Sequence, residues 1–153
     1  MNSIVLFIAV ILMWIVVIAG FYQRIVEMPK WFSNPPASFE LMRRQRKKTR
    51  KFWVSLSVLF MMSACTALIL NWQLSDIRNH IIGAMVCFGL TVALSGIYFG
   101  REVIAFTKIP LEAPQTPELL RRTRRWLRWT SVRNVLQVFA TAFVSIAFNH
   151  LRF

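Results

Sequence analysis

The sequence predicts an all-α protein: a four-helix transmembrane bundle that forms a single membrane domain over residues 1–153. The chain is 56% hydrophobic although its formal net charge is +13. Four stretches are free or nearly free of charge: residues 4–22, 52–72, 81–100 and 132–148. A hydrocarbon core of about 30 Å requires about 20 helical residues, which each stretch supplies. Soluble helices would need a polar face, and these stretches have none.

The first stretch, residues 4–22, has the position of a secretory signal peptide. However, the preceding residues 1–3 carry no positive charge, and the apolar run exceeds an ordinary signal-peptide core. We therefore predict a helix that is retained in the membrane. A cleaved leader is the alternative.

The second and third stretches, residues 52–72 and 81–100, each contain one cysteine near the middle, Cys65 and Cys87. Thiol-exchange enzymes need paired cysteines, and the sequence has no C-x-x-C motif. We predict that both cysteines are small apolar residues that fill space between the helices.

The basic residues are distributed unevenly along the chain. Nine of the 19 Lys and Arg residues lie in the loop 23–51, and eight lie in or directly after the loop 101–131, which leaves only Arg78 and Arg152. The positive-inside rule therefore places both basic loops in the cytoplasm and both termini outside, in a bacterial inner (cytoplasmic) membrane. Anionic lipid headgroups are the expected partner of these charges, and no nucleic-acid partner is expected.

The two halves of the chain resemble each other. The same spacing separates Pro36 from Pro114 and Glu40 from Glu118, and basic residues follow in both halves. Each half reads as a span, a proline-containing loop, a basic segment and a returning span. We interpret this as two repeated helical hairpins related by an axis along the membrane normal. Convergence of arginine-rich segments is the alternative.

The residues around the prolines predict where the second and fourth helices begin. Pro36 and Pro114 end the preceding helices because proline cannot continue them. Ser38 and Thr116 are predicted N-caps, and Pro117 occupies the favoured first helical position. The two Lys- and Arg-rich segments, residues 38–53 and 116–129, are then the first turns of helices that extend beyond the bilayer.

Two histidines, His80 and His150, are predicted to be neighbours at the outer membrane boundary. Haem ligation would require histidines inside the hydrocarbon, so interfacial residues are the simpler interpretation. The sequence contains no zinc-protease, serine-hydrolase or phosphate-binding motif, and we expect no metal site.

Several polar residues lie at the end of the predicted bundle that carries the two basic loops. They are Tyr22, Arg24 and Glu27 after the first span, Tyr98, Arg101 and Glu102 after the third, and Arg133, Asn134 and Gln137 in the fourth. The spacing of Arg133, Asn134 and Gln137 places them on one helical face, and such residues are costly in lipid, which indicates a pocket. The alternative is that Arg133 extends to headgroups while the amides bond to neighbouring helices. The spans contain no acidic residue near mid-membrane, which argues against a proton-coupled exporter.

Two segments resemble the anthrone-oxygenase family of small four-helix membrane proteins: "FYQRIVEMPKWFSNPPASF" at residues 21–39 and "WLRWTSVR" at residues 126–133. Family members often carry W-x-x-W-N-H-x-R before the last span. Trp126, Trp129 and Arg133 match this pattern, whereas Thr130 and Ser131 replace its Asn and His. The resemblance implies oxidation of an aromatic substrate without a metal or organic cofactor.

We therefore expect a pocket for an apolar aromatic or quinone-like molecule. Arg133 would stabilise a phenolate or enolate, and Glu27 would act as a base. The expected substrate-binding residues are Tyr22, Arg24, Tyr98, Arg101, Trp129, Asn134 and Gln137. The alternative is a non-catalytic accessory or scaffold subunit, or a lipid-binding protein, with a membrane-protein partner or a second copy of the chain.

Overall fold

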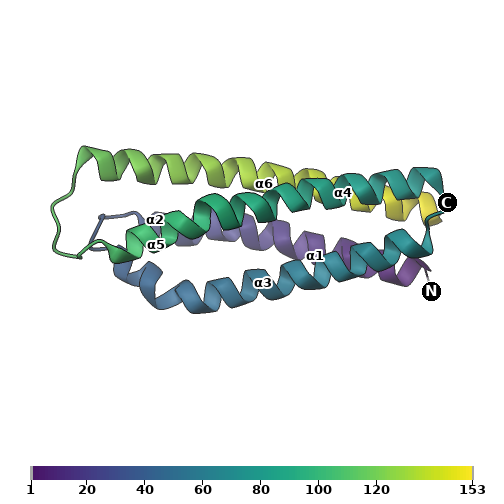
Figure 1. Cartoon of the computed structure of the whole chain (residues 1–153), viewed down its shortest axis with the longest axis horizontal. Helices are drawn as coiled ribbons and strands as arrows, with labels where there is room; N and C mark the ends of the chain where they lie inside the picture. The colour runs from purple at the N-terminus through teal and green to yellow at the C-terminus, as the bar shows by residue number, and fades with distance from the viewer. Residues whose placement is uncertain (1, 153) are drawn as a thin grey trace.

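The computed structural model describes the backbone of residues 2–152 and the side chains of residues 3–151, and it is helical almost throughout. In chain order, the segments are α1 (Asn2–Tyr22), η1 (Gln23–Glu27), α2 (Met28–Trp31), α3 (Phe39–Leu70), α4 (Ser75–Leu94), η2 (Ser95–Phe99), α5 (Gly100–Lys108) and α6 (Pro117–Arg152). The π-helical turns η1 and η2 continue the helices before them, so the segments form four columns (Figure 1). The predicted all-α four-helix bundle is confirmed.

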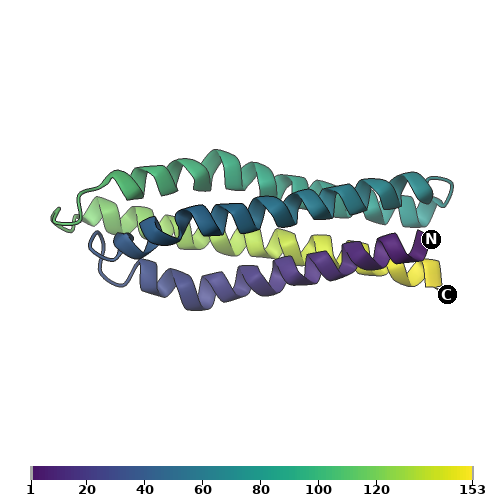
Figure 2. The ribbon, with the colours of Figure 1, turned by 90° about the horizontal axis from the view of Figure 1, so that it is seen from below.

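The four columns lie side by side along one long axis, as the two perpendicular views show (Figures 1 and 2). Both termini and the turn between α3 and α4 lie at one end. The connections at residues 32–38 and 109–116 lie at the other end, on the left of Figure 1. We call this the basic end, because most of the Lys and Arg residues lie on the helices near it. Consecutive columns are therefore antiparallel.

Each column contains a segment long and apolar enough to cross a membrane: residues 3–31, 39–70, 75–108 and 117–151. By the length and composition of these helices, the protein is an integral membrane protein. The 36 residues of α6 extend about 54 Å at about 1.5 Å per residue, well beyond a hydrocarbon core of about 30 Å. Part of the bundle therefore stands outside the bilayer.

Helix α6 packs against α4 and α1, and α1 also packs against α3. The buried face of α6 follows a heptad spacing, since Leu119, Trp126, Arg133, Ala140 and Ala147 are all buried at every seventh position. This spacing keeps one stripe of a helix against its neighbours in an antiparallel bundle. The stripe includes Arg133, so a cation occupies a core position.

The buried apolar residues form two separate clusters. The membrane cluster lies in the apolar spans and contains several alanines, including Ala9, Ala64 and Ala84, which let the helices approach closely. The aromatic cluster lies towards the basic end and consists of Met28, Trp31, Phe39, Met42, Phe99, Phe106, Leu119 and Trp126. Ring centroids in it are as close as 4.7 Å, between Phe99 and Trp126.

The predicted cap of α6 is confirmed and that of α3 is wrong. The hydroxyl of Thr116 accepts a hydrogen bond from the Leu119 N–H at 3.2 Å, and Pro117 is the first residue of α6. Ser38 precedes α3, but its backbone is already helical and its hydroxyl makes no cap bond. That hydroxyl instead donates to the Trp31 carbonyl at 2.7 Å, which ties the loop 32–38 to the end of α2.

The prediction for the cysteines holds for only one of them. Cys87 is half-buried and packs against the membrane cluster, whereas Cys65 is exposed. The reason is helical geometry: α3 buries Ala64, and each residue turns the side chain by about 100° around the axis, so Cys65 points outward.

The two halves of the chain follow the same order of elements. Each consists of a long helix, a π turn, a short helix, a loop and a second long helix. This matches the two hairpins expected from the repeated proline and glutamate positions. That the hairpins arose by duplication stays a prediction.

The orientation in the membrane is testable at the two ends of the bundle. In a Cys65→Ser/Cys87→Ser background, we expect Gln73→Cys to react with a membrane-impermeant maleimide in intact cells, because it lies in the outer turn. Gln115→Cys, in a loop at the basic end, should react only after the membrane is opened. Both glutamines are exposed, so accessibility to water is matched. Labelling of only Gln115→Cys in intact cells would reverse the predicted orientation.

Candidate functional site

A layer of buried polar side chains separates the membrane cluster from the aromatic cluster. We call it the polar layer, and it consists of Gln23, Thr130, Arg133, Asn134 and Gln137. Gln23 begins η1, and the other four lie on α6 between the buried residues Trp126 and Ala140. The layer lies close to the start of the apolar stretch 132–148, near the edge of the hydrocarbon towards the basic end.

The polar layer occupies the same core stripes as the apolar residues around it. On α1 the buried positions Met13 and Val16 are continued, at intervals of three or four residues, by Gly20 and Gln23. The next buried residue is Met28, five positions later, because η1 contains one wide π turn. The π turn therefore lets both Gln23 and the aromatic cluster face the inside of the bundle.

Gly20 allows α1 and α6 to approach at the polar layer. The Asn134 side-chain amide donates to the Gly20 carbonyl at 3.3 Å. A Cβ atom at position 20 would lie 2.7 Å from Gln137 Oε1 and 3.2 Å from Asn134 Oδ1. Glycine is required here by the close approach of side chains from α6.

Arg133 contacts all three other columns of the bundle. Its Nη2 donates a hydrogen bond to Gln23 Oε1 at 3.2 Å, which connects α6 to η1. Its Cζ lies 5.0 Å from the ring centroid of Phe99 on η2 and 5.5 Å from that of Trp53 on α3. Arg133 is only 8% exposed. One guanidinium thus joins the four columns at a single level.

The charge of Arg133 is not neutralised by a carboxylate within residues 3–151. Removing an ion from water costs several kcal/mol, even after the surroundings relax. A hydrogen bond from a charged donor returns about 1.5–3 kcal/mol, and each cation–π contact returns at most about 2 kcal/mol when desolvated. The nearest acidic side chain on η2–α5, Glu102, is already bound to Arg122 at 3.0 Å. The contacts at Arg133 therefore roughly offset the cost of its burial, although its Nε has no hydrogen-bond partner within residues 3–151.

Several buried polar atoms at and beside the polar layer have no hydrogen-bond partner in the part of the chain that the structure describes. In the polar layer they are Arg133 Nε, Asn134 Oδ1 and Gln137 Oε1. In and beside the aromatic cluster they are the Tyr98 hydroxyl and Trp126 Nε1. Buried polar atoms are nearly always satisfied, and lipid offers no substitute for water. This level of the bundle therefore holds donors and acceptors that could bond to a further polar group.

The structure brings together three of the residues expected from the sequence and links two others to them. Arg133, Asn134 and Gln137 are buried together, as their spacing predicted. Tyr98 lies 6.0 Å from Trp129, measured between ring centroids, at the edge of the aromatic cluster. Tyr98 also contacts Phe99, which in turn lies against Arg133. Tyr98 and Trp129 are thus linked to the polar layer through one aromatic ring.

The remaining expected residues form no hydrogen bond or ion pair with the polar layer within residues 3–151. Tyr22 is 57% exposed and Arg101 is also exposed. Arg24 is half-buried, and its Nε has no hydrogen-bond partner among the described residues. Glu27 is half-buried on η1 and forms no ion pair within residues 3–151. Glu102 forms an ion pair with Arg122 on α6.

Sequence reasoning missed Gln23, Trp53 and Phe99 as neighbours of Arg133. The sequence did contain a signal for Gln23. It follows the buried positions of α1 at the same interval of three or four residues, where an apolar residue would be expected. Trp53 lies where an aromatic residue of the membrane interface is expected, so its sequence position does not predict the contact with Arg133. Phe99 carries no polar signal, and its orientation depends on the π turn η2.

The two histidines lie at the opposite end of the bundle. Their ring centroids are 5.5 Å apart, so the prediction that they are neighbours is confirmed. His80 Nδ1 also lies 2.7 Å from the Asp76 carbonyl oxygen. Within residues 3–151, no group of three or more His, Cys, Asp and Glu side chains is placed to hold a metal ion.

Comparisons of the chain with protein-family models, with curated proteins and with solved structures found no match. The resemblance to the anthrone-oxygenase family therefore stays a prediction that two short sequence segments support.

We expect Gly20→Ala to destabilise the bundle, because the new methyl group would displace the buried amides of Gln137 and Asn134. Overpacking of this kind costs about 1–3 kcal/mol. The measurement is the thermal unfolding midpoint in detergent. Gly89→Ala is the matched control, since its Cβ would meet nothing within 4 Å and alanine favours helix. Equal midpoints for the two variants would show that the close approach at Gly20 is unimportant.

Proposed function

We propose that the polar layer binds a small aromatic molecule that carries an acidic hydroxyl or a quinone carbonyl, with Arg133 as its anchor. The observation that carries the proposal is the burial of Arg133 without a carboxylate and with its Nε unpaired. A buried arginine of this kind in a membrane protein is a functional-site hypothesis by default. An oxygen atom bearing full or partial negative charge would satisfy it.

The unpaired groups near Arg133 favour an aromatic ligand over a simple anion. Arg133 Nε, the Tyr98 hydroxyl and Trp126 Nε1 are all hydrogen-bond donors, and a quinone presents acceptor carbonyls on a flat ring. Phe99 and Trp126, which pack edge to face with ring centroids 4.7 Å apart, provide an aromatic environment beside this level. An apolar molecule of this class can also reach the site through the bilayer.

The chemistry proposed for the site is stabilisation of a phenolate or enolate by Arg133. Glu27 is the proposed base, which would accept the proton that the ligand loses. It lies on the same π turn as Gln23, the hydrogen-bond partner of Arg133. Within residues 3–151 its carboxylate is not engaged in an ion pair. Oxidation of the ligand rests on the family resemblance alone.

The proposal also includes the cellular setting. The concentration of Lys and Arg at one end of the bundle supports a bacterial inner membrane with the basic end in the cytoplasm. The polar layer would then lie at the cytoplasmic edge of the hydrocarbon, where a ligand can exchange with either lipid or water.

The test begins with native mass spectrometry of the protein released from its own membrane in mild detergent. We expect a bound aromatic small molecule in the wild-type protein and its loss in Arg133→Ala. For a hydroxylated anthraquinone as probe, Arg133→Ala should weaken binding by about ten- to a hundredfold, as loss of a charge-assisted hydrogen bond predicts.

Arg128→Ala is the matched control, because Arg128 is an exposed arginine on the same helix. Arg133→Lys separates folding from binding, since it keeps the charge but loses the planar fork. Probe affinity that is equal in wild type and in a folded Arg133→Ala protein would contradict the proposal. If the wild-type protein is released from the membrane with a stoichiometric partner chain and without a small molecule, the accessory-subunit alternative is favoured.

A further inference from the structure

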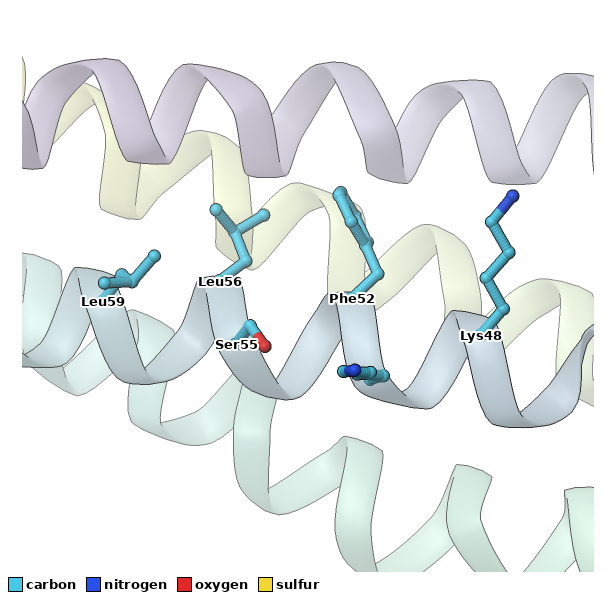
Figure 3. A pocket seen from close by; sticks show the side chains of 6 residues that line it. Lys48, Phe52, Ser55, Leu56 and Leu59 are labelled. Carbon is cyan, nitrogen blue, oxygen red and sulfur yellow. The ribbon is translucent and has the colours of Figure 1, made fainter.

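A groove of about 460 Å³ lies on α3 near the basic end (Figure 3). It is lined by Lys48, Lys51, Phe52, Ser55, Leu56 and Leu59. Figure 3 shows Lys48, Phe52 and Leu56 pointing from α3 into the space beside the neighbouring α1 ribbon. Leu56 is buried, while Phe52 and Leu59 are about half exposed, so the groove has an apolar floor that is open to the bilayer.

The chemistry of the groove changes along the helix axis. One face of α3 carries Lys48, Phe52 and Leu59, because Phe52 follows Lys48 by four residues and Leu59 follows it by eleven. Lys51 immediately precedes the apolar stretch 52–72, whose helical part, residues 52–70, extends about 28 Å at about 1.5 Å per residue. That length matches a hydrocarbon core of about 30 Å. The ammonium groups therefore lie at headgroup depth, and the apolar floor lies at acyl-chain depth.

The lysines of the groove are free to bind an anion. Elsewhere at the basic end, arginines pair with nearby glutamates: Arg44 with Glu40 at 2.9 Å, Arg121 with Glu118 at 2.6 Å and Arg122 with Glu102 at 3.0 Å. Lys48 and Lys51 form no ion pair in the described part of the chain. Two unneutralised ammonium groups three residues apart suit a phosphate group.

We propose that this groove binds an anionic phospholipid of the surrounding bilayer. Its phosphate lies between the ammonium groups of Lys48 and Lys51, and one acyl chain lies over Phe52, Leu56 and Leu59. The floor requires an apolar chain attached to the phosphate, which a soluble phosphate lacks. Juxtamembrane basic residues attract anionic lipids, and the groove fixes the position of one of them.

The lipid groove is separate from the polar layer. Trp53, the residue after Phe52, lies against Arg133, so adjacent residues of α3 serve the two sites on different faces. The proposal is therefore independent of the small-molecule proposal and can be tested alone.

The test uses the full-length protein in lipid nanodiscs or mild detergent. Native mass spectrometry measures the retention of phosphatidylglycerol and of phosphatidylcholine. We expect wild type to retain phosphatidylglycerol preferentially, and Lys48→Gln/Lys51→Gln to bind it about thirtyfold more weakly, as loss of two headgroup-level charges predicts. Glycerol phosphate, the headgroup chemistry without acyl chains, should not displace the lipid.

The matched control is Lys47→Gln/Arg50→Gln, which removes the same charge from exposed positions of α3 that do not line the groove. We expect this variant to retain phosphatidylglycerol as wild type does. An equal loss in both double variants would reduce the effect to general electrostatics and overturn the proposal. Equal retention of phosphatidylcholine, displacement by glycerol phosphate, or a protein chain occupying the groove would also overturn it.

Discussion

The burial of one guanidinium, that of Arg133, is the constraint on which the arrangement of the bundle depends. This side chain meets η1 through Gln23, α3 through Trp53 and η2 through Phe99. A charge cannot be left without contacts at the edge of the hydrocarbon, so the columns must converge around it. The two π turns lie at the same level, where they supply Gln23 and Phe99. Single π turns are rare and often mark functional positions, in agreement with this role.

The polar layer also explains why the core is divided. In lipid, apolar side chains gain little by moving from acyl chains to a protein interior, so packing alone specifies helix pairing weakly. The membrane cluster relies on small residues such as Ala9 and Ala84 for close contact. A slip of α6 against α1 by one heptad would place Gln137 and Arg133 against apolar residues. Polar residues at core-stripe positions therefore fix the register, as they do in coiled coils. Beyond the layer, large rings fill the bundle towards the basic end.

The sequence predicted the features that depend on composition and on regular helical spacing. It gave the four spans, the cap at Thr116 and the shared face of Arg133, Asn134 and Gln137. It failed where one residue breaks the regular spacing. The π turn η1 shifts every later residue of its column by about 100°, which no propensity predicts. Tyr22 lies directly before this turn, as the last residue of α1, and its side chain is exposed. The interior neighbours Trp53 and Phe99 are apolar and resemble ordinary core or interface residues.

The two cationic sites of the protein cannot share one kind of anion. Lys48 and Lys51 open onto the bilayer at headgroup depth, so a lipid phosphate can reach them without entering the bundle. Arg133 lies inside, covered by Trp53 and Phe99, and only 8% of it is exposed. A phospholipid headgroup, tied to its own acyl chains, cannot pass between the columns to meet it. The oxygen that we propose as the partner of Arg133 would therefore belong to water or to a molecule small and flat enough to enter between aromatic rings. Among such molecules, only one with an apolar frame offsets the desolvation of its own polar group, which is the physical reason for favouring an aromatic ligand.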